Sequence, residues 1–248
     1  MIPVITIYNT TIPKLLLKNQ HSFFDKLILI YNSEIDTKKL QLPNNCFVLK
    51  NLNKNFVAGA LNKGIKFGIK QGHNKFLLLD DDSSFIDEKD ILELNKKKID
   101  NEIFQLRNSS DNIKSEITIT NGTVITKSVF EKIGCFNEKM GIDLVDVDYF
   151  FEVKKNGLSF ERTSKIYLEH NLGYYNNRFI TTPNYNSFRY YKQAKNLIIL
   201  TKKHWTYFPF KISYIIIRKL YYFSKIILFE KNRLSNIKFI LKGLYDGF

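Results

Sequence analysis

Three consecutive aspartates, Asp80, Asp81 and Asp82, follow an apolar run in the segment FLLLDDDSSF, residues 76–85. Adjacent carboxylates repel one another, and the arrangement costs stability unless a bound cation or a proton relieves it. Because side chains alternate along an extended chain, Asp80 and Asp82 point the same way and can share one cation. Hard divalent ions such as Mg²⁺ and Mn²⁺ prefer such oxygen ligands together with phosphates. The segment therefore predicts a metal that holds a nucleotide diphosphate.

The aspartate run has three rival interpretations. A calcium loop is excluded, because the sixth position counted from Asp80 is Phe85 instead of glycine and the twelfth is Ile91 instead of glutamate. A haloacid-dehalogenase-type phosphatase also begins with an apolar strand and D-x-D-x-[ST], and would use Asp80 as its nucleophile. That fold usually carries the motif on its first strand, whereas several strands precede it here. An acidic loop that merely follows a strand is the remaining alternative.

A second acidic group, Asp143, Asp146 and Asp148, lies in the segment GIDLVDVDYF. Acids at the start of a helix cap free amides and complement the helix dipole. This structural role alone can explain the presence of Asp143, as an N-cap, and of Asp148. Asp146 gains a chemical role only if it faces the first group. His170, in EHNLG, follows a strand and precedes a glycine turn, so it is either a packed or surface residue or a ligand.

The first part of the chain alternates strand-like and helix-like patterns. Residues 3–8, 26–31 and 46–49 are predicted strands, and residues 56–71 have the apolar spacing of a helix that stops at Gly72. A fourth strand, residues 76–79, follows. This order is typical of a doubly wound α/β sheet, in which ligands bind at the carboxyl ends of the strands. Asp80 to Ser83 lie at such an end.

The remaining elements are predicted as follows. Residues 87–114 form a helix and then a loop, and residues 117–126 form a strand interrupted at Asn121–Gly122. Short and long helices cover residues 128–133 and 144–156, the second ending on Gly157, and residues 167–173 form a strand edge and a turn. From residue 186 on, two or three amphipathic helices are expected.

The positive charge is concentrated near the end of the chain. The net charge is +14, and residues 189–248 contain 13 Lys and Arg against Glu230 and Asp246, a net of +11. Aromatic and apolar residues interleave with these cations. Such a tail favours an anionic partner, a membrane surface or nucleic acid, unless its apolar faces pack on the rest of the protein or on a second subunit.

Cysteine usage and the apolar segments bear on the compartment. Cys46 and Cys135 are far apart and in no C-x-x-C pair, which argues against a disulfide framework or a zinc site and fits a reducing cytoplasm. The start, MIPVITIYN, lacks the pattern of a signal peptide, and no run approaches the roughly 18 to 20 apolar residues that span a bilayer. A cytoplasmic protein is expected.

These segments together resemble the family 2 glycosyltransferases of GT-A fold, particularly the bacterial rhamnosyltransferase-like branch that includes galactofuranosyltransferases. The resemblance covers nearly the whole chain, with the motifs in the family's order. The matching segments are ITIYN, LILIYNSE, NKNFVAGALNKGI, LLLDDDSSF, NGTVITKSVFEKIGCFNE, GIDLVDVDYF, EHNLG and NSFRYYKQAKN.

The resemblance implies a GT-A fold, Rossmann-like with a doubly wound, mostly parallel sheet, and a helical basic-aromatic extension. Residues 1–185 would form the catalytic domain, with a nucleotide-sugar half at about 1–85 and an acceptor half at about 115–185, and residues 186–248 the tail. Mn²⁺ or Mg²⁺ would be held by Asp80, Asp82 and, as a third ligand, His170. Asp146 would be the general base, with Asp143 and Asp148 orienting or tuning it. The residues implied in donor binding are Tyr31, Asn32, Asn55, Asn62, Asp80, Asp81, Asp82 and Gly122.

Some residues depart from the family pattern. Tyr31 stands where the family has an aspartate that reads the nucleotide base, although a tyrosine can stack on a pyrimidine. The other departures are Val57 for glycine, Glu152 for arginine, Lys195 for arginine and Asn121 for serine. None of these removes a metal ligand or the base.

The implied activity is inverting, metal-dependent transfer of a sugar to a lipid-linked glycan, as in O-antigen or capsule synthesis. The donor would be dTDP-L-rhamnose or, second, a UDP-linked galactofuranose or galactose. The tail would dock the cytoplasmic enzyme on the inner, anionic face of the membrane or join it to a second copy. The rivals are the phosphatase and a non-enzymatic basic module that binds membrane or nucleic acid, for which no RNP-like, KH-like or zinc signature is present.

Overall fold

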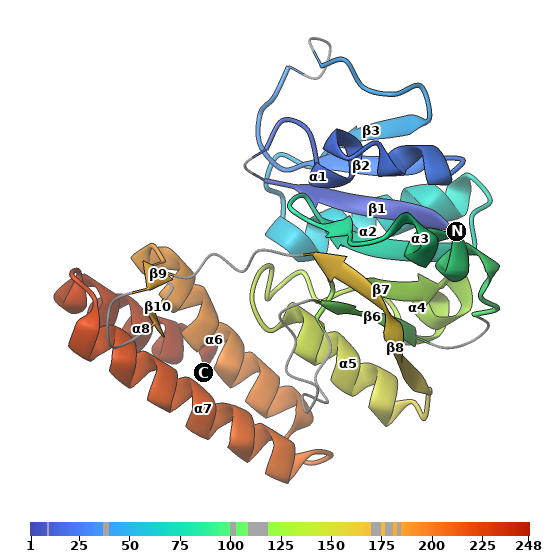
Figure 1. Cartoon of the computed structure of the whole chain (residues 1–248). Coiled ribbons are helices and arrows are strands. Elements are labelled where there is room, and N and C mark those ends of the chain that lie inside the picture. Colours follow the sequence, from blue (N-terminus) through green and yellow to red (C-terminus); the bar gives the residue numbers. More distant parts are fainter. Residues whose placement is uncertain are drawn as a thin grey trace. The chain divides into compact units, whose positions relative to one another are not determined.

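The computed structural model describes residues 1–8, 10–36, 40–99, 103–108, 119–169, 175–176, 181–182 and 185–248. These residues form two compact units (Figure 1). The first comprises Met1–Gly141 and Tyr149–Asn171, and the second comprises Ile142–Asp148 and Leu172–Phe248. This grouping differs from the division expected at residue 186, because the segment with the second acidic group belongs with the C-terminal helices.

An eight-stranded sheet organises the first unit, in the order β3-β2-β1-β4-β7-β6-β8-β5. The strand bounds are β1 Ile2–Ile7, β2 Leu27–Tyr31, β3 Cys46–Lys50, β4 Lys75–Asp80, β5 Ser84–Phe85, β6 Ile103–Asn108, β7 Thr123–Thr126 and β8 Phe160–Glu169. The pairs β1–β2, β2–β3, β1–β4 and β6–β8 are parallel, and the other neighbours are antiparallel. The expected α/β fold with a mostly parallel sheet is confirmed.

The helices of the first unit are short except for α2. Their bounds are α1 Lys14–Leu17, the 3₁₀ helix η1 Gln20–Phe23, α2 Phe56–Lys70, α3 Glu88–Lys96 and α4 Lys127–Ile133, and α5 Val145–Lys155 begins in the second unit. Glycines let α2 approach the sheet closely: a Cβ at Gly64 would lie 2.4 Å from Ile30 Cδ1, and one at Gly68 would lie 2.6 Å from Phe76 Cε1. The expected helix over residues 56–71 and its stop before Gly72 are confirmed.

Buried aliphatic side chains explain the central strands. All six residues of β1 and all five of β2 are buried, as in parallel strands covered on both faces. The chain runs from β1 to β2 and β3 on one side and then returns to β4 on the other side of β1 (Figure 1). This reversal of strand order makes the carboxyl ends of β1 and β4 a switch point, where open α/β sheets bind ligands.

In the middle of the chain, one prediction was wrong and another is confirmed only in part. Strand β6, Ile103–Asn108, lies in residues that were expected to be a loop after a helix. The first four residues of β6 are all buried, and polar Gln105 among them hid the apolar pattern. The strand expected over residues 117–126 is confirmed only in its second part, as β7, because the described residues 119–122 precede the strand and are not part of it.

Three helices, α6 Ser187–His204, α7 Pro209–Phe229 and α8 Arg233–Gly247, make up most of the second unit, with a small antiparallel pair, β9 Tyr175–Asn176 and β10 Thr181–Thr182. Their shared core contains Tyr190, Ala194, Phe223, Ile226 and Ile240. Helices α6 and α8 pack closely at two glycines: a Cβ at Gly243 would lie 2.3 Å from the carbonyl oxygen of Tyr191. Within the described residues, no helix has both the length and the apolar character to cross a membrane.

Candidate active site

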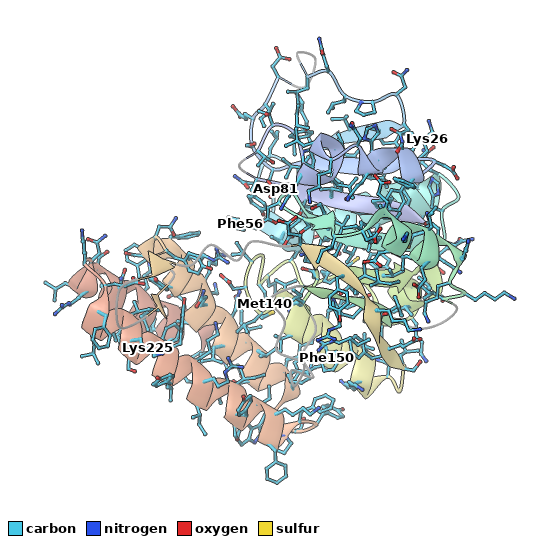
Figure 2. The ribbon with its side chains drawn as sticks, in the orientation of Figure 1. Lys26, Phe56, Asp81, Met140, Phe150 and Lys225 are labelled. Carbon is cyan, nitrogen blue, oxygen red and sulfur yellow. The ribbon has the colours of Figure 1, made fainter. Side chains whose placement is uncertain are left out.

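The first aspartate group lies at the switch point of the sheet, at the end of β4. Asp80 is the last residue of β4, and the side chains of Asp80, Asp81 and Asp82 are half-buried. Asp81 Oδ2 accepts hydrogen bonds from the Tyr8 amide and the Thr10 hydroxyl, both at 3.0 Å, which ties this turn to the loop after β1. In Figure 2, Asp81 lies at the opposite end of the strands from Lys26, which precedes β2.

Asn121 fixes the turn that carries the aspartates. Its side-chain oxygen accepts from the Asp80 amide at 3.2 Å and from the Ser83 hydroxyl at 3.0 Å, and Asn121 is buried. Gly122 is a residue predicted to bind the donor, and its left-handed backbone leaves no room for a side chain, since a Cβ would lie 2.7 Å from Leu168 Cδ1. Asn121, at the position where the family has serine, is the residue whose side chain contacts the turn of the aspartates.

Tyr31 and Asn32 occupy the end of β2 in buried positions. Tyr31 is fully buried, its hydroxyl donates to the carbonyl oxygen of Thr11 at 2.8 Å, and burial raises its pKa to about 12. Asn32 is buried and accepts from Asn51 Nδ2 at 2.8 Å. The Tyr31 ring therefore has no exposed face for stacking on a base. The hydrogen bonds of Tyr31 and Asn32 connect the end of β2 to Thr11 and Asn51.

Asn55 and Asn62 hold the segment after α4. The buried carboxamide of Asn62 donates to the carbonyl oxygen of Phe136 and to Glu138 Oε1, both at 2.9 Å, and accepts from the Phe136 amide at 2.8 Å. The Asn55 amide donates to Glu138 Oε2. These bonds, with that from Asn62 foremost, lower the pKa of Glu138 even though its partial burial acts in the opposite direction. Both asparagines are predicted donor-binding residues, and both are bound to the carboxylate of Glu138, which belongs to no predicted site.

The second aspartate group, Asp143, Asp146 and Asp148, belongs to the second unit. Helix α5 begins at Val145, so the expected N-cap role of Asp143 is wrong. The Asp143 carboxylate instead accepts from Arg189 Nε at 3.0 Å and from Arg189 Nη2 at 3.1 Å, a bidentate pair. Asp143 and Leu144 have left-handed backbones, with φ of 58° and 62°.

Asp146 is half-buried, and it is the member of the group whose pKa is raised. Burial raises the pKa of Asp146 to about 6, the backbone amide of Val147 opposes this, and the neighbouring Asp143 raises the pKa further. Asp146 Oδ1 accepts from that amide at 2.9 Å. A carboxyl group that loses its proton near pH 6 is suited to accept a proton at neutral pH.

Asp148 is buried and paired with basic residues of α6. Its Oδ1 lies 2.8 Å from Nε2 of the buried His204, and its Oδ2 accepts from Lys203 Nζ at 3.0 Å. Burial alone would raise the pKa of Asp148, but the hydrogen bond from His204 and the charge of Lys203 outweigh it and lower the pKa. The partners of Asp143 and Asp148 lie 46 and 56 residues further along the chain, so no local pattern indicated them.

The oxygen atoms at the end of β4 fit a hard divalent ion that also binds phosphates, since two alternating carboxylates supply part of a coordination shell and phosphates supply the rest. Among the described residues, no three His, Cys, Asp or Glu side chains are grouped as a metal site. His170, the expected third ligand, lies outside the described residues. The metal therefore stays a prediction.

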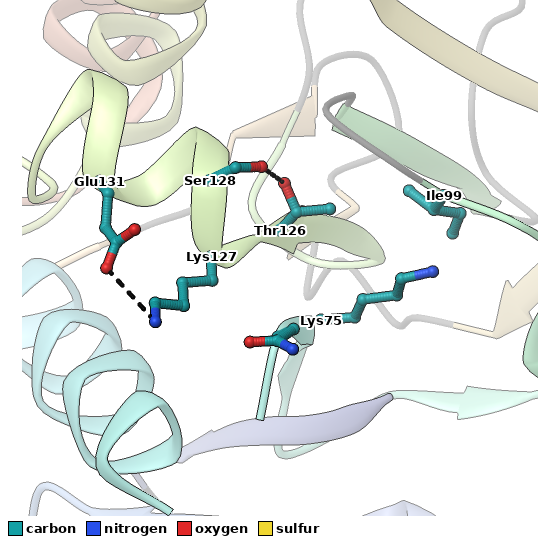
Figure 3. Close-up of a pocket in the computed structure, with 7 residues that line it drawn as sticks. Lys75, Ile99, Thr126, Lys127, Ser128 and Glu131 are labelled. Carbon is teal, nitrogen blue, oxygen red and sulfur yellow. Dashed lines mark hydrogen bonds and ion pairs between the residues drawn. The ribbon is translucent and has the colours of Figure 1, made fainter. Parts of the chain in front are cut away.

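A pocket of about 280 Å³ lies at the other end of β4 (Figure 3). It is lined by Asn74, Lys75, Ile99, Thr126, Lys127, Ser128 and Glu131. Lys75 is the first residue of β4 and Asp80 the last, so this pocket lies at the amino end of β4, opposite to the switch point. None of the residues predicted for the site lines it.

Comparison with known proteins assigns the fold. No family model matches the chain. The crystal structure of S. aureus TarS aligns over the whole chain with a TM-score of 0.50 and 12% sequence identity, and the chain spans 43% of the length of TarS. Together with the strand order, this match gives the chain the GT-A-like fold of glycosyltransferases.

The sequence relationship is more particular. Over 221 residues the chain is 24% identical to the dTDP-rhamnosyl transferase RfbF of Shigella flexneri, a match that covers 77% of this chain and 74% of RfbF.

Proposed function

We propose that this protein is an inverting glycosyltransferase that uses a nucleotide-diphosphate sugar, dTDP-L-rhamnose first and a UDP-linked galactofuranose or galactose second. The observation that carries the proposal is the run of three half-buried carboxylates at the switch point of a GT-A-like sheet. The relationship to a dTDP-rhamnosyl transferase supports the choice of sugar. The acceptor would be a lipid-linked glycan of a bacterial surface polysaccharide, O-antigen or capsule.

Asp80 and Asp82, with His170 as a third ligand, would hold Mn²⁺ or Mg²⁺. Bound there, the ion would offset the charge of the departing nucleotide diphosphate. The hydrogen bonds from Tyr8 and Thr10 to Asp81, and the bond from the Asp80 amide to Asn121, restrain the turn that carries these carboxylates. Ligand binding would therefore cost little further conformational entropy in this turn.

Asp146 would act as the general base. Its carboxylate takes the proton of an acceptor hydroxyl, and the oxygen attacks the anomeric carbon from the face opposite the diphosphate. One C–O bond forms as the C–O bond to the diphosphate breaks, so the configuration at that carbon inverts. The pKa of about 6 supports this role, because Asp146 is then ionised at neutral pH and still basic enough to accept the proton.

The exposed face of α7 supports docking on an anionic membrane. Five large exposed side chains recur at helical spacing along it: Phe210, Tyr214, Ile217, Tyr221 and Leu228. A row of cations seven residues apart, Lys211, Arg218 and Lys225, runs beside them, and Arg218 and Lys225 lie over the rings of Tyr214 and Tyr221. Aromatic and apolar groups flanked by cations are typical of helices that lie in a membrane interface.

Thermal unfolding with nucleotides tests the enzyme. The wild type is heated with UDP, dTDP, GDP or CDP, each with and without Mn²⁺. Asp80→Asn is measured in the same way, and the control is Asp25→Asn, an exposed carboxylate just before β2, at the amino ends of the strands. A ligand at 100 times its Kd stabilises by about 2.7 kcal/mol. We expect one nucleotide to stabilise the wild type and the control only with metal, and not Asp80→Asn.

Two other outcomes would overturn the proposal. A phosphoenzyme that forms on incubation with a phosphate monoester and disappears in Asp80→Asn would identify the phosphatase. A salt-sensitive shift with an oligonucleotide, without any response to nucleotides, would identify a basic binding module.

A further inference from the structure

The segment Ile142–Asp148 has a conformation that it does not hold by local preference. Asp143 and Leu144 are consecutive non-glycine residues with positive φ, which is a strained backbone that persists only where the surroundings enforce it. Both residues immediately precede the turn of α5 that carries Asp146. Something outside the segment must therefore hold it in place.

Helix α6 supplies the groups that hold this segment. Arg189, Asn196 and Lys203 recur every seven residues, so they lie on one face of the helix, and His204 follows directly. Arg189 binds the Asp143 carboxylate through two nitrogens. Asn196 Nδ2 donates to the carbonyl oxygens of Ile142 at 2.6 Å and Asp143 at 2.9 Å. Lys203 and His204 bind Asp148 from the far end of the helix.

Asp146 lies in the sequence between Asp143 and Asp148, the two aspartates that α6 binds. Its neighbours Asp143 and Asp148 are each bound by cationic or imidazole groups of α6. In the part of the chain that is described, the hydrogen bonds to the Asp146 carboxylate come from backbone amides. Two of the three aspartates thus anchor the segment, and among the described residues no side chain donates a hydrogen bond to the carboxylate of the third.

We propose that His204, together with Arg189, is a positioning residue that acts through Asp148 and Asp143 to hold the Asp146 carboxylate in the place where it works. The inference rests on the proposed function, in which Asp146 accepts the proton of the acceptor hydroxyl. A shift of about 1 Å in a reacting group can cost on the order of 10²-fold in rate, so an anchor two residues from the base affects the chemical step without touching substrate.

Substitutions at His204 test the inference with a conservative and a disruptive variant. His204→Gln keeps an amide N–H donor near the position of Nε2, whereas His204→Leu removes the donor and leaves the buried Asp148 without it. The matched control is Tyr190→Phe, which removes another buried α6 hydrogen bond to a carboxylate, that to Glu230 at 2.6 Å, and Glu230 is not part of the segment Ile142–Asp148. All are measured as full-length protein for kcat, donor KM, the pH profile and melting temperature.

We expect His204→Leu to lower kcat at least 10-fold with donor KM within about 2-fold, and His204→Gln to restore most of kcat. The amides of Val147 and Asp148 should exchange with deuterium faster in His204→Leu than in the wild type. Tyr190→Phe should lower the melting temperature while leaving kcat and those amides unchanged. Arg189→Lys, which keeps the charge but loses the fork, should show a smaller loss of kcat than His204→Leu.

Failure of this inference differs from failure of the proposed function. If Asp146→Asn abolishes transfer while His204→Leu matches Tyr190→Phe in kcat, the positioning role is refuted and the base is retained. If the wild type transfers no sugar, the exchange of the Val147 and Asp148 amides still decides: no increase in His204→Leu refutes the anchoring.

Discussion

The side-chain oxygen of Asn121 accepts a hydrogen bond of 3.2 Å from the backbone amide of Asp80, although 41 residues separate them. The same oxygen accepts from the Ser83 hydroxyl, and the Ser83 amide donates to the carbonyl oxygen of Asp80 at 3.1 Å. One buried amide therefore connects the start of β7 to the turn with the three aspartates. The position of the three carboxylates therefore depends on Asn121 as well as on strand β4.

Asn121→Ala should impair both stability and ligand binding. It leaves the Asp80 amide and the Ser83 hydroxyl without their acceptor, which costs about 1–3 kcal/mol, or a fall of roughly 2–12 °C in the melting temperature. Because the turn is freed, the metal-dependent stabilisation by nucleotide should shrink as well.

The control for Asn121 is Asn45→Ala. The side-chain amide of Asn45 donates to the carbonyl oxygens of His21 at 3.1 Å and Phe24 at 3.0 Å. Asn45 immediately precedes β3, so it lies at the amino ends of the strands, away from the aspartates. It should lose comparable stability and keep the nucleotide response. Equal nucleotide responses in the two variants would show that Asn121 does no more than stabilise the fold.

Transfer should fall as the pH drops through about 6, because Asp146 must be ionised to accept a proton and its pKa is about 6. The acid limb of the profile of kcat/KM should lie there, and Asp146→Asn should reduce kcat by at least 10³-fold, about 4 kcal/mol at 1.36 kcal/mol per decade. If Asp146→Asn protein keeps measurable activity and its pH profile still has an acid limb near pH 6, a group other than Asp146 causes that limb.

The same group predicts the opposite trend for stability. The folded state binds the Asp146 proton more tightly than the unfolded chain does, so its contribution is present in acid and is lost as the pH rises through about 6. Asp146→Asn should therefore melt higher than the wild type at pH 8, and the difference should vanish near pH 4. Melting curves at the two pH values measure this without any substrate.

The sequence predicted those parts of the site that depend on short segments. The central strands followed from aliphatic runs buried on both faces, and the position of Asp80 at a strand end followed from the run itself. Strand β6 was missed because polar Gln105 lies in the buried sheet, where it donates to the Asn121 carbonyl oxygen at 2.9 Å and accepts from Thr123. The apolar pattern cannot show that a buried amide is paired.

The roles of single residues were harder to predict because they depend on distant partners. Tyr31 and Asn62 lie where the family resemblance implies donor contacts, yet both are buried and bound to backbone groups. His204 belongs to no motif, and only the fold brings it to Asp148. A motif identifies a residue type at a position, whereas burial and the partner decide what the residue does.

Close packing of α6 on α8 should be sensitive to a single methyl group. A Cβ at Gly243 would lie 2.3 Å from a backbone carbonyl oxygen of α6, so Gly243→Ala must push the helices apart. We expect a loss of about 1–3 kcal/mol, measured by urea unfolding, although alanine has the higher helix propensity. Lys238→Ala, at an exposed position of α8, should change stability by less than about 0.5 kcal/mol.

The face of α7 should bind anionic vesicles through its cations and its apolar side chains together. Neutralising Lys211, Arg218 and Lys225 to Gln removes about 1 kcal/mol for each cation near the surface, which together weakens binding roughly 100-fold. Co-sedimentation with vesicles of phosphatidylglycerol and phosphatidylcholine measures this, with pure phosphatidylcholine as the uncharged reference.

A matched variant separates this face from net charge. Lys70, Lys96 and Lys132 are exposed in the first unit, and their change to Gln removes the same charge from another surface. That variant should bind vesicles nearly as the wild type does, whereas Phe210→Ser with Ile217→Ser should weaken binding with every cation kept. If both triple variants lose binding equally, the attraction is a property of total charge and α7 is not the docking face. If the double serine variant instead converts a dimer to a monomer, the apolar row joins two copies of the chain.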